Sequence, residues 1–265
     1  AIDAIVLRSV STLRPSNPID ITTDNVTIDG VAITSSGTTG IGIVAEGTAA
    51  RPIRNITIRN CSINGFSIGI EARHVENLVI DNCAIANADY AGIAVYSGVG
   101  GRITNNVVRK IGYTRTNFSG QFGNNAYGIA LDHYAYGTLT ADPYSSGFVV
   151  DHNTVEDVPL WMCFNVHAAQ NTTFSNNTSG GCPRAFFIAG DATGHPSRNV
   201  TVTRNLIQRP VTKPGGTADI EGVLLSRLQG GAVTYNQIAR GYSPPVYDYL
   251  GASTNVTISG NTVIP

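Results

Sequence analysis

The sequence predicts an all-β solenoid, a parallel β-helix of about nine stacked rungs. Three observations predict it: a short repeat, an alternating apolar pattern within that repeat, and one repeat position that asparagine occupies six times in succession. Repeats of 20 to 50 residues are typical of solenoids. The whole chain, residues 1–265, is interpreted as one domain with a loop insertion at about 112–146.

The repeat consists of nine eight-residue segments that align without gaps, such as ITIRNCSI at 56–63. The third residue of each segment serves as its anchor. The anchors are Ile28, Ile58, Ile80, Ile103, Val150, Phe174, Val202, Val233 and Ile258. Successive anchors lie 30, 22, 23, 47, 24, 28, 31 and 25 residues apart, which indicates a short unit that carries insertions.

Each unit contains short strands. Apolar residues alternate with polar ones, which is the period of a strand and not of a helix. A second apolar strand follows in most units, for example at 67–71, 127–133 and 163–167. Gly and Asn turns separate the strands. Short strands joined by tight turns predict one coil of a β-helix per unit.

The asparagine column lies three residues after the anchors. Its members are Asn106, Asn153, Asn177, Asn205, Asn236 and Asn261. The turn preference of asparagine explains one or two of these positions but not six. Rungs stacked about 4.8 Å apart let each side-chain amide bond the next. The column therefore predicts an asparagine ladder.

The cysteines are expected inside the coil. Cys61 and Cys83 occupy the asparagine column in earlier units, with a disulfide between them as one alternative. Cys163 and Cys182 are expected as buried thiols near corresponding corners. Because the chain has no CxxC spacing and no HExxH segment, the sequence predicts no metal site and identifies no cofactor.

Composition restricts the partners. Only 13% of residues are charged and the net charge is −1, so no basic surface for nucleic acid is expected. No apolar run reaches the roughly 18 residues that a membrane span needs. Composition therefore predicts neither a nucleic-acid partner nor a membrane span.

The repeat resembles that of the right-handed parallel β-helix superfamily, which includes pectate and alginate lyases, polygalacturonases, uronan C5-epimerases and phage tailspikes. The resemblance covers about Asn25 to Pro265 and implies a right-handed coil. YGIALDH at 127–133 is similar to the YGxDPH segment of alginate epimerases, although it is displaced by two residues and lacks the proline. The similarity implies catalytic roles for Asp132 and His133.

Other motifs of that superfamily are missing. The polygalacturonase segments NTD, DD, GHG and RIK do not occur in order, and GHP at 194–196 is only a fragment of them. The RxPxxR segment of pectate lyases and their stacked calcium-binding aspartates are also absent. The resemblance therefore specifies the fold more closely than the activity.

The outer wall formed by the second strands is the candidate site, because outward residues of successive coils form columns. The predicted column reads Val44, Glu71, Tyr96, Asp132, His167, Ala189 and Ser226. One or two residues further along lie Arg73, His133, Tyr134, Asp191 and Arg227. Nowhere else does the sequence gather acids, histidines, tyrosines and arginines in this way.

The 47-residue interval places two long loops beside this wall, at 112–125 and 134–146. Long loops in compact repeats are uncommon unless they are functional. The aromatic residues in and beside them are Tyr113, Phe118, Phe122, Tyr127, Tyr134, Tyr136 and Tyr144. Such rings suit stacking on sugars, and packing of the loops onto the wall is the alternative.

Proton transfer is assigned to four residues of the wall. Asp132 and His167 fall on adjacent rungs, where a carboxylate can orient an imidazole as general acid or base. His133 and Tyr96 are further candidates, and Tyr134 is an alternative proton donor.

Substrate binding is assigned to charged and aromatic neighbours. Arg73 and Arg227 would neutralise a uronate carboxylate. Glu71 and Asp132, two rungs or about 9.6 Å apart, would also suit inverting glycoside hydrolysis. The predicted binding residues are Glu71, Arg73, Tyr127, Tyr134, Asp191 and Arg227.

Two functions remain open. The first is a polysaccharide lyase, epimerase or hydrolase that acts on an acidic polysaccharide outside the cell, in the periplasm or on a virion. The second is a non-catalytic tailspike, fibre or adhesion module that binds glycan. No capping helix is evident before the first rung and the sequence ends in mid-coil, so a homotrimer partner or a missing domain would cover the open edge. Alternatively, residues 1–20 form a partial first coil.

Overall fold

Strands one coil apart pair side by side along the whole chain. The computed structural model describes residues 5–8, 12–13, 19–37, 39–113, 125–133, 144–191, 194–213 and 220–265. The regular structure in these ranges is β except for one short 3-10 turn, η1 (Tyr249–Gly251).

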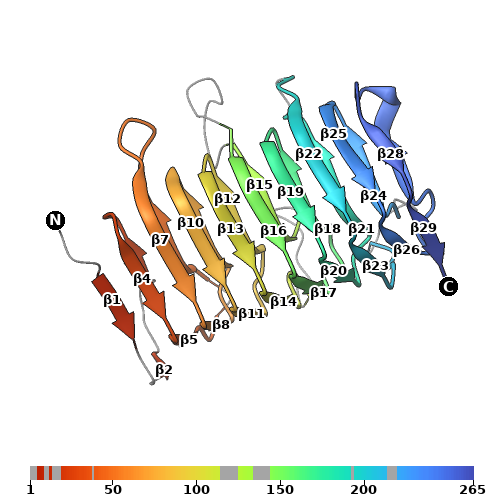
Figure 1. The fold of residues 1–265 in the computed structure, drawn as a ribbon. Helices are drawn as coiled ribbons and strands as arrows, with labels where there is room; N and C mark the ends of the chain where they lie inside the picture. The colour runs from red at the N-terminus through yellow and green to blue at the C-terminus, as the bar shows by residue number, and fades with distance from the viewer. Residues whose placement is uncertain are drawn as a thin grey trace.

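The strands form three parallel sheets, and each coil gives one strand to each sheet except the last, which contributes only β28 and β29 (Figure 1). Sheet A contains, in spatial order, β1 (Ile5–Arg8), β4 (Val26–Asp29), β7 (Ile53–Arg59), β10 (Val75–Asp81), β13 (Val99–Thr104), β16 (Ser146–Asp151), β19 (Gln170–Ser175), β22 (Ser197–Thr203), β25 (Leu228–Thr234) and β28 (Thr257–Ser259). Sheet B contains β2 (Thr12–Leu13), β5 (Ala32–Thr34), β8 (Ser62–Asn64), β11 (Ala84–Ala86), β14 (Val107–Arg109), β17 (Thr154–Glu156), β20 (Thr178–Gly180), β23 (Leu206–Gln208), β26 (Gln237–Ala239) and β29 (Thr262–Ile264).

Sheet C carries the candidate site. It contains β3 (Ile19–Ile21), β6 (Ile41–Glu46), β9 (Ile68–Arg73), β12 (Ala91–Tyr96), β15 (Tyr127–Asp132), β18 (Met162–His167), β21 (Arg184–Ala189), β24 (Val223–Ser226) and β27 (Val246–Asp248). The prediction of a right-handed parallel β-helix with about nine rungs is confirmed. In addition, β1 pairs with β4 and β2 with β5, which is the predicted alternative of a partial first coil.

The predicted anchors pair in register from Ile28 to Ile258. Inward isoleucines, valines and phenylalanines build one continuous core along the coil. In its middle, Phe164 stacks on Phe186 with ring centroids 4.6 Å apart, and both meet Phe174 edge to face. The period-two pattern therefore selects the buried face of sheet A correctly.

Single residues in the left-handed conformation make the bends from sheet A to sheet B. Asn60, Asn105 and Asn176 have φ values of 55°, 57° and 52°. Asparagine tolerates this region better than most residues, which explains its frequency directly after the sheet A strands.

The asparagine ladder is present and buried. Each side-chain amide nitrogen donates to Oδ1 of the next asparagine, at 2.8–3.0 Å, from Asn106 to Asn261. The same Oδ1 atoms accept the backbone N–H of the preceding asparagine. The ladder thus satisfies buried polar groups of the backbone as well as its own amides.

The cysteines differ from one expectation. Cys163 and Cys182 form a disulfide with Cα atoms 5.8 Å apart, so the prediction of two buried thiols is wrong. Cys163 lies in β18, and Cys182 lies in the turn before β21 on the next coil, which brings them together at one corner. Cys61 and Cys83 are buried free thiols, so the alternative of a disulfide between them is not realised.

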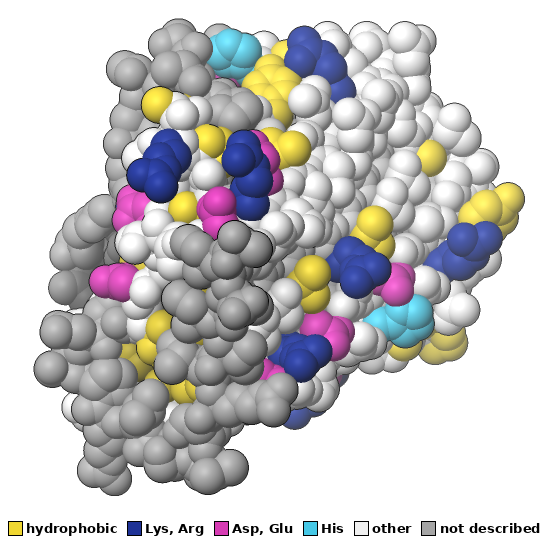
Figure 2. All heavy atoms as spheres, turned by 60° about the vertical axis from the view of Figure 1, so that its left-hand side comes forward, with side chains coloured by type: hydrophobic (Ala, Val, Ile, Leu, Met, Phe, Trp, Pro, Cys, Tyr) yellow, Lys and Arg dark blue, Asp and Glu magenta, His cyan; other side chains and the backbone are white. Residues whose placement is uncertain are grey.

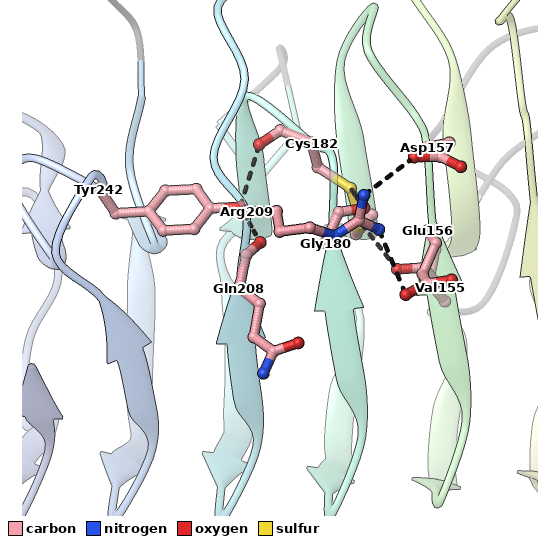
Figure 3. The surroundings of a disulfide bond; sticks show 9 residues. Val155, Glu156, Asp157, Gly180, Cys182, Gln208, Arg209 and Tyr242 are labelled. Atoms are coloured by element: carbon pink, nitrogen blue, oxygen red, sulfur yellow. Dashed lines mark hydrogen bonds and ion pairs between the residues drawn. A yellow bond between two sulfur atoms is a disulfide. The ribbon is translucent and has the colours of Figure 1, made fainter. Parts of the chain in front are cut away.

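The surroundings of the disulfide tie four coils together (Figure 3). Tyr242 donates from its hydroxyl to the main-chain oxygens of Cys182 at 3.0 Å and Gln208 at 3.3 Å. Burial raises the pKa of the Tyr242 phenol, which keeps it a hydrogen-bond donor. Arg209 pairs with Glu156 at 3.2 Å and Asp157 at 3.5 Å.

Candidate functional site

The outward column at the carboxyl ends of the sheet C strands differs from the predicted one at its start. The strand register gives the column Glu46, Arg73, Tyr96, Asp132, His167, Ala189 and Ser226. Glu71 pairs with Val44 and Ala94 instead, so it lies two residues before this column. The predicted neighbourhood of Glu71 and Tyr96 is therefore wrong.

Glu71 belongs to an internal ion-pair group. Its side chain is 0% exposed and contacts Arg73, which also binds Glu46 at 3.1 Å. Burial raises the pKa of Glu71, although the positive charge of Arg73 opposes the rise. A fully buried carboxylate cannot touch a polymer, which removes Glu71 from the substrate-binding set and from a hydrolytic pair with Asp132. The charge of Arg73 is already balanced by two carboxylates.

Glu71→Gln is expected to flatten the pH dependence of stability. Because the folded protein raises the pKa of Glu71, it favours the protonated carboxyl. The associated stability is present at low pH and is lost as pH rises above the unfolded pKa of about 4.3 and through the raised folded value. The melting temperature of the unaltered protein should fall relative to that of Glu71→Gln in this window.

Glu76→Gln is the matched control, because Glu76 is a partly exposed glutamate paired with Arg54 on sheet A. It should show no comparable relative gain as the pH rises. If the melting curves of Glu71→Gln and the unaltered protein stayed parallel at every pH, the assigned cost of ionising Glu71 would be wrong.

Asp132 and His167 come together as predicted. They are register partners on β15 and β18, and Oδ1 of Asp132 lies 3.5 Å from Nδ1 of His167. Oδ1 also accepts the backbone N–H of His167 at 2.9 Å and the side-chain amide of Asn165 at 3.1 Å. Ser145 donates to the main-chain oxygen of Asp132, which holds the end of β15. The Asp132 carboxylate is thus held by one backbone donor and one side-chain donor, both from β18.

The His167 ring is oriented by two contacts. Asn165 donates to its Nδ1 at 3.0 Å, so the neutral ring carries its proton on Nε2. Phe187 packs edge to face against it, with centroids 5.3 Å apart. The side chain remains 36% exposed, so a polymer on this face of sheet C can contact the imidazole.

The predicted tyrosines are less accessible. Tyr96 is the register partner of Asp132 but is buried in a small apolar cluster on the outer face of sheet C. Tyr127 is buried in the same cluster and meets Tyr90 edge to face, with centroids 5.3 Å apart. Burial raises the pKa of Tyr127, so it stays protonated and uncharged. Tyr127 therefore packs the wall and presents no open ring, whereas Tyr134 lies outside the described residues.

A second polar group lies directly beyond β15. Nε2 of His133 is 3.6 Å from Oδ2 of Asp191, which is 2.7 Å from Nδ1 of His195. Tyr144 meets both imidazoles edge to face, with centroids 5.4 Å from His133 and 6.2 Å from His195. Arg227 donates to the main-chain oxygen of Asp191 at 2.7 Å. This combination of two imidazoles and a carboxylate could hold a metal ion.

Of the remaining loop aromatics, Tyr113 is exposed. Phe118, Phe122 and Tyr136 lie outside the described residues, as does most of the predicted insertion at 112–146.

Charged groups are mixed on the visible surface: Figure 2 shows basic and acidic side chains in small neighbouring groups separated by wide uncharged areas. The part of this face that the structure describes therefore presents no large area of one charge.

Two residues of the site escaped sequence reasoning. Asn165 stands between two apolar residues of the strand CFNVH, where the repeat gives it no distinct role. His195 lies in GHP, which the sequence offers only as a fragment of a polygalacturonase motif. One signal could have found Asn165. It is polar at the fourth position of its strand, where β12 and β15 carry alanine.

Comparisons with known proteins agree with the architecture. A family model for the right-handed beta helix region matches residues 16–142. A structure of PfbA, a surface adhesin of Streptococcus pneumoniae, has a TM-score of 0.61 at 16% identity, covering 95% of this chain and 58% of that one. The catalytic unit of a GH87 alpha-1,3-glucanase from Streptomyces thermodiastaticus gives 0.56 at 16% identity, covering 91% of this chain and 49% of that one.

A third similar structure is the A-module of the mannuronan C-5 epimerase AlgE4 of Azotobacter vinelandii. Its TM-score is 0.51 at 14% identity, with 95% of this chain and 76% of that one covered. No curated protein sequence matches this chain. This chain spans only about half of the adhesin and glucanase structures. At these identities the likeness shows the fold: the chain is a right-handed parallel β-helix protein.

Among the residues that the structure describes, no helix has the length and apolar character needed to cross a membrane.

Proposed function

We propose that this protein is a carbohydrate-active β-helix enzyme that acts on an acidic polysaccharide bound along the outer face of sheet C. The observation that carries the proposal is the oriented pair of Asp132 and His167. A carboxylate and an imidazole on adjacent strands, both fixed by further donors, suit proton transfer on a bound polymer.

The chemistry follows from the positions of the two side chains. Asp132 takes up a proton from the sugar, and Nε2–H of His167 donates a hydrogen bond to a developing negative charge on an adjacent oxygen. For a uronate, loss of the C5 proton leaves the electron pair delocalised into the sugar carboxylate. Expulsion of the 4-oxygen, which takes the proton held by Asp132 as the bond between C4 and this oxygen breaks, gives elimination and restores the carboxylate. Delivery of a proton from water to C5 on the opposite face gives epimerisation, and the hydroxide formed takes the proton from Asp132.

Structural neighbours support the substrate class. Their names identify them as a mannuronan C-5 epimerase, an alpha-1,3-glucanase and a surface adhesin. The names of the first two state that they act on polysaccharides. The surface adhesin supports a location of this protein outside the cell or on a surface. Arg227 adds positive charge beside the site through its contact with Asp191. We therefore place the polymer across β12, β15, β18 and β21.

The test is a screen of alginate, pectate and neutral glucans with three readouts. Ultraviolet absorbance detects the unsaturated product of elimination, deuterium incorporation at C5 detects epimerisation, and reducing ends detect hydrolysis. Elimination or epimerisation that disappears in Asp132→Asn supports the proposal. Asp151→Asn is the matched control, because Asp151 also contacts a histidine, His152, but ends a strand of sheet A.

Two results would overturn the proposed enzymatic function. One is glycan binding without any product, which would leave a non-catalytic binding module. The other is activity that persists in Asp132→Asn, which would move the chemistry elsewhere. A product formed only by hydrolysis of neutral glucans would contradict the acidic substrate.

A further inference from the structure

We propose that His133, Asp191 and His195 form a binding site for a divalent transition-metal ion of the zinc type. The three residues offer two imidazole nitrogens and one carboxylate oxygen, all within 4.8 Å of one another. Nitrogen and carboxylate ligands in this ratio are typical of zinc and other first-row divalent metals. The inference does not depend on polysaccharide chemistry.

Two of the three ligand-atom distances fit a small cation after a minor adjustment, and the third, between the two imidazole nitrogens, is within 4.8 Å. Ligand atoms held tetrahedrally at about 2.0–2.1 Å from a zinc ion lie roughly 3.3 Å apart. The pair His133 Nε2 and Asp191 Oδ2 is at 3.6 Å, close to this value. The pair His195 Nδ1 and Asp191 Oδ2, at 2.7 Å, must open by roughly half an ångström. Because His195 is 42% exposed, its ring has room to make this movement.

The three residues come from two coils that are not adjacent. His133 follows β15, whereas Asp191 follows β21, and β18 lies between these two strands. Rungs two apart are separated by about 9.6 Å, and the contact between the side chains of His133 and Asp191 spans this distance. The connection from β18 to β19 is 168–169, but that from β21 to β22 extends over 190–196.

Asp191 and His195, in the connection from β21 to β22, are joined by two hydrogen bonds. Asp191 donates its backbone N–H to the oxygen of His195 at 2.9 Å, and His195 donates its own N–H to Oδ1 of Asp191, also at 2.9 Å. Gly190 permits this approach, since a Cβ there would lie 2.4 Å from the oxygen of His195. Oδ1 of Asp191 is thereby oriented by the backbone, while Oδ2 faces both imidazoles.

The surroundings favour an ion over a simple charge pair. The side chains of His133 and Asp191 are 2% and 6% exposed, so the pair is shielded from water. The guanidinium of Arg227 donates to the main-chain oxygen of Asp191. Arg198 lies over the Tyr144 ring, with Cζ 5.5 Å from its centroid. Ser97 contacts the main-chain oxygen of His133 and fixes that ligand's backbone.

Three protein ligands leave a fourth tetrahedral position open on the exposed side of His195. Zinc sites with three protein ligands and an open position bind water or an anionic oxygen there. The chemistry of this position thus suits a carboxylate or hydroxyl of an external ligand. Asp132 precedes His133 directly in the chain, so the ion would lie near the Asp132 and His167 pair.

The test is metal titration of the chelator-treated protein by calorimetry with Zn²⁺ and by visible absorption with Co²⁺. We expect one ion per chain. Asp191→Asn and His195→Ala should each weaken Zn²⁺ binding by at least about 10-fold, the smallest effect expected even for loss of a supporting partner. Far-ultraviolet dichroism of both variants checks that the coil is intact, and His195 is exposed enough for its replacement to leave the fold unchanged.

His152→Asn is the matched control, because it removes an exposed histidine that also contacts an aspartate. It should bind Zn²⁺ as the unaltered protein does. Absence of stoichiometric binding, or binding that survives both Asp191→Asn and His195→Ala, would overturn the site. These readouts need no substrate, so stoichiometric zinc binding by a protein with no polysaccharide activity would support the metal site while contradicting the proposed enzyme.

Discussion

Replacing Asn177 with alanine is expected to lower the free energy of unfolding by about 2–5 kcal/mol. Asn177 accepts the backbone N–H of Asn153 at 2.9 Å and donates to the oxygen of Val150 at 2.9 Å and to Asn205 at 3.0 Å. Alanine supplies none of these side-chain bonds. Each buried polar group that loses its partner costs about 1–3 kcal/mol, and the missing amide leaves a void as well.

Chemical denaturation followed by circular dichroism measures this loss. Asn82→Gly is the matched control: Asn82 also joins an amide to a neighbouring asparagine, Asn60, at 2.8 Å, but it is exposed and has a φ of 52°. Glycine accepts that backbone angle, so the control should change stability by less than about 1 kcal/mol. Equal effects of the two substitutions would show that burial of the ladder does not stabilise the coil.

Asp132→Asn and His167→Ala are each expected to reduce turnover of the responsive polysaccharide by about 10²–10⁴-fold. Asparagine keeps the shape of Asp132 but cannot accept the substrate proton. Alanine removes the Nε2–H donor and the ring that Asn165 and Phe187 hold in place. Initial rates at saturating and limiting polymer separate the change in kcat from a change in KM.

The double variant distinguishes a working pair from two independent residues. If Asp132 and His167 act as a unit, the double variant should be little slower than the slower single variant. Multiplication of the two losses would contradict a joint role. Asp151→Asn should leave both kcat and KM unchanged, because Asp151 lies on sheet A.

The fold was predictable because its signals recur in every coil. Nine anchors and six asparagines fix the register of sheet A and the neighbouring turn, and the structure confirms both. The start of the sheet C column was not predictable in the same way. Strict alternation is unchanged by a shift of two residues, so it cannot distinguish Ile68 from Ile70 as the partner of Ile93. In the structure Ile70 pairs with Ile93 in the core, whereas Ile68 pairs with Ala91 and belongs to the cluster that contains Tyr96.

The candidate site was predictable only where it follows the repeat. Asp132 and His167 end consecutive sheet C strands, so their contact follows from register. His195 lies in the connection between β21 and β22 and at no position of the repeat, so no periodic pattern predicts its contact with Asp191. The disulfide escaped prediction for a similar reason, because Cys182 lies in a turn and not at a strand position.

The asparagine ladder also gives the solenoid an electrical polarity. Every ladder Oδ1 accepts hydrogen bonds from the N-terminal side, so the side-chain amide dipoles align along the coil axis. Aligned hydrogen bonds polarise one another, and a group in the middle of such a row is strengthened by neighbours on both sides. Amide protons bonded to the central asparagines should therefore exchange with solvent more slowly than those at the two ends of the row.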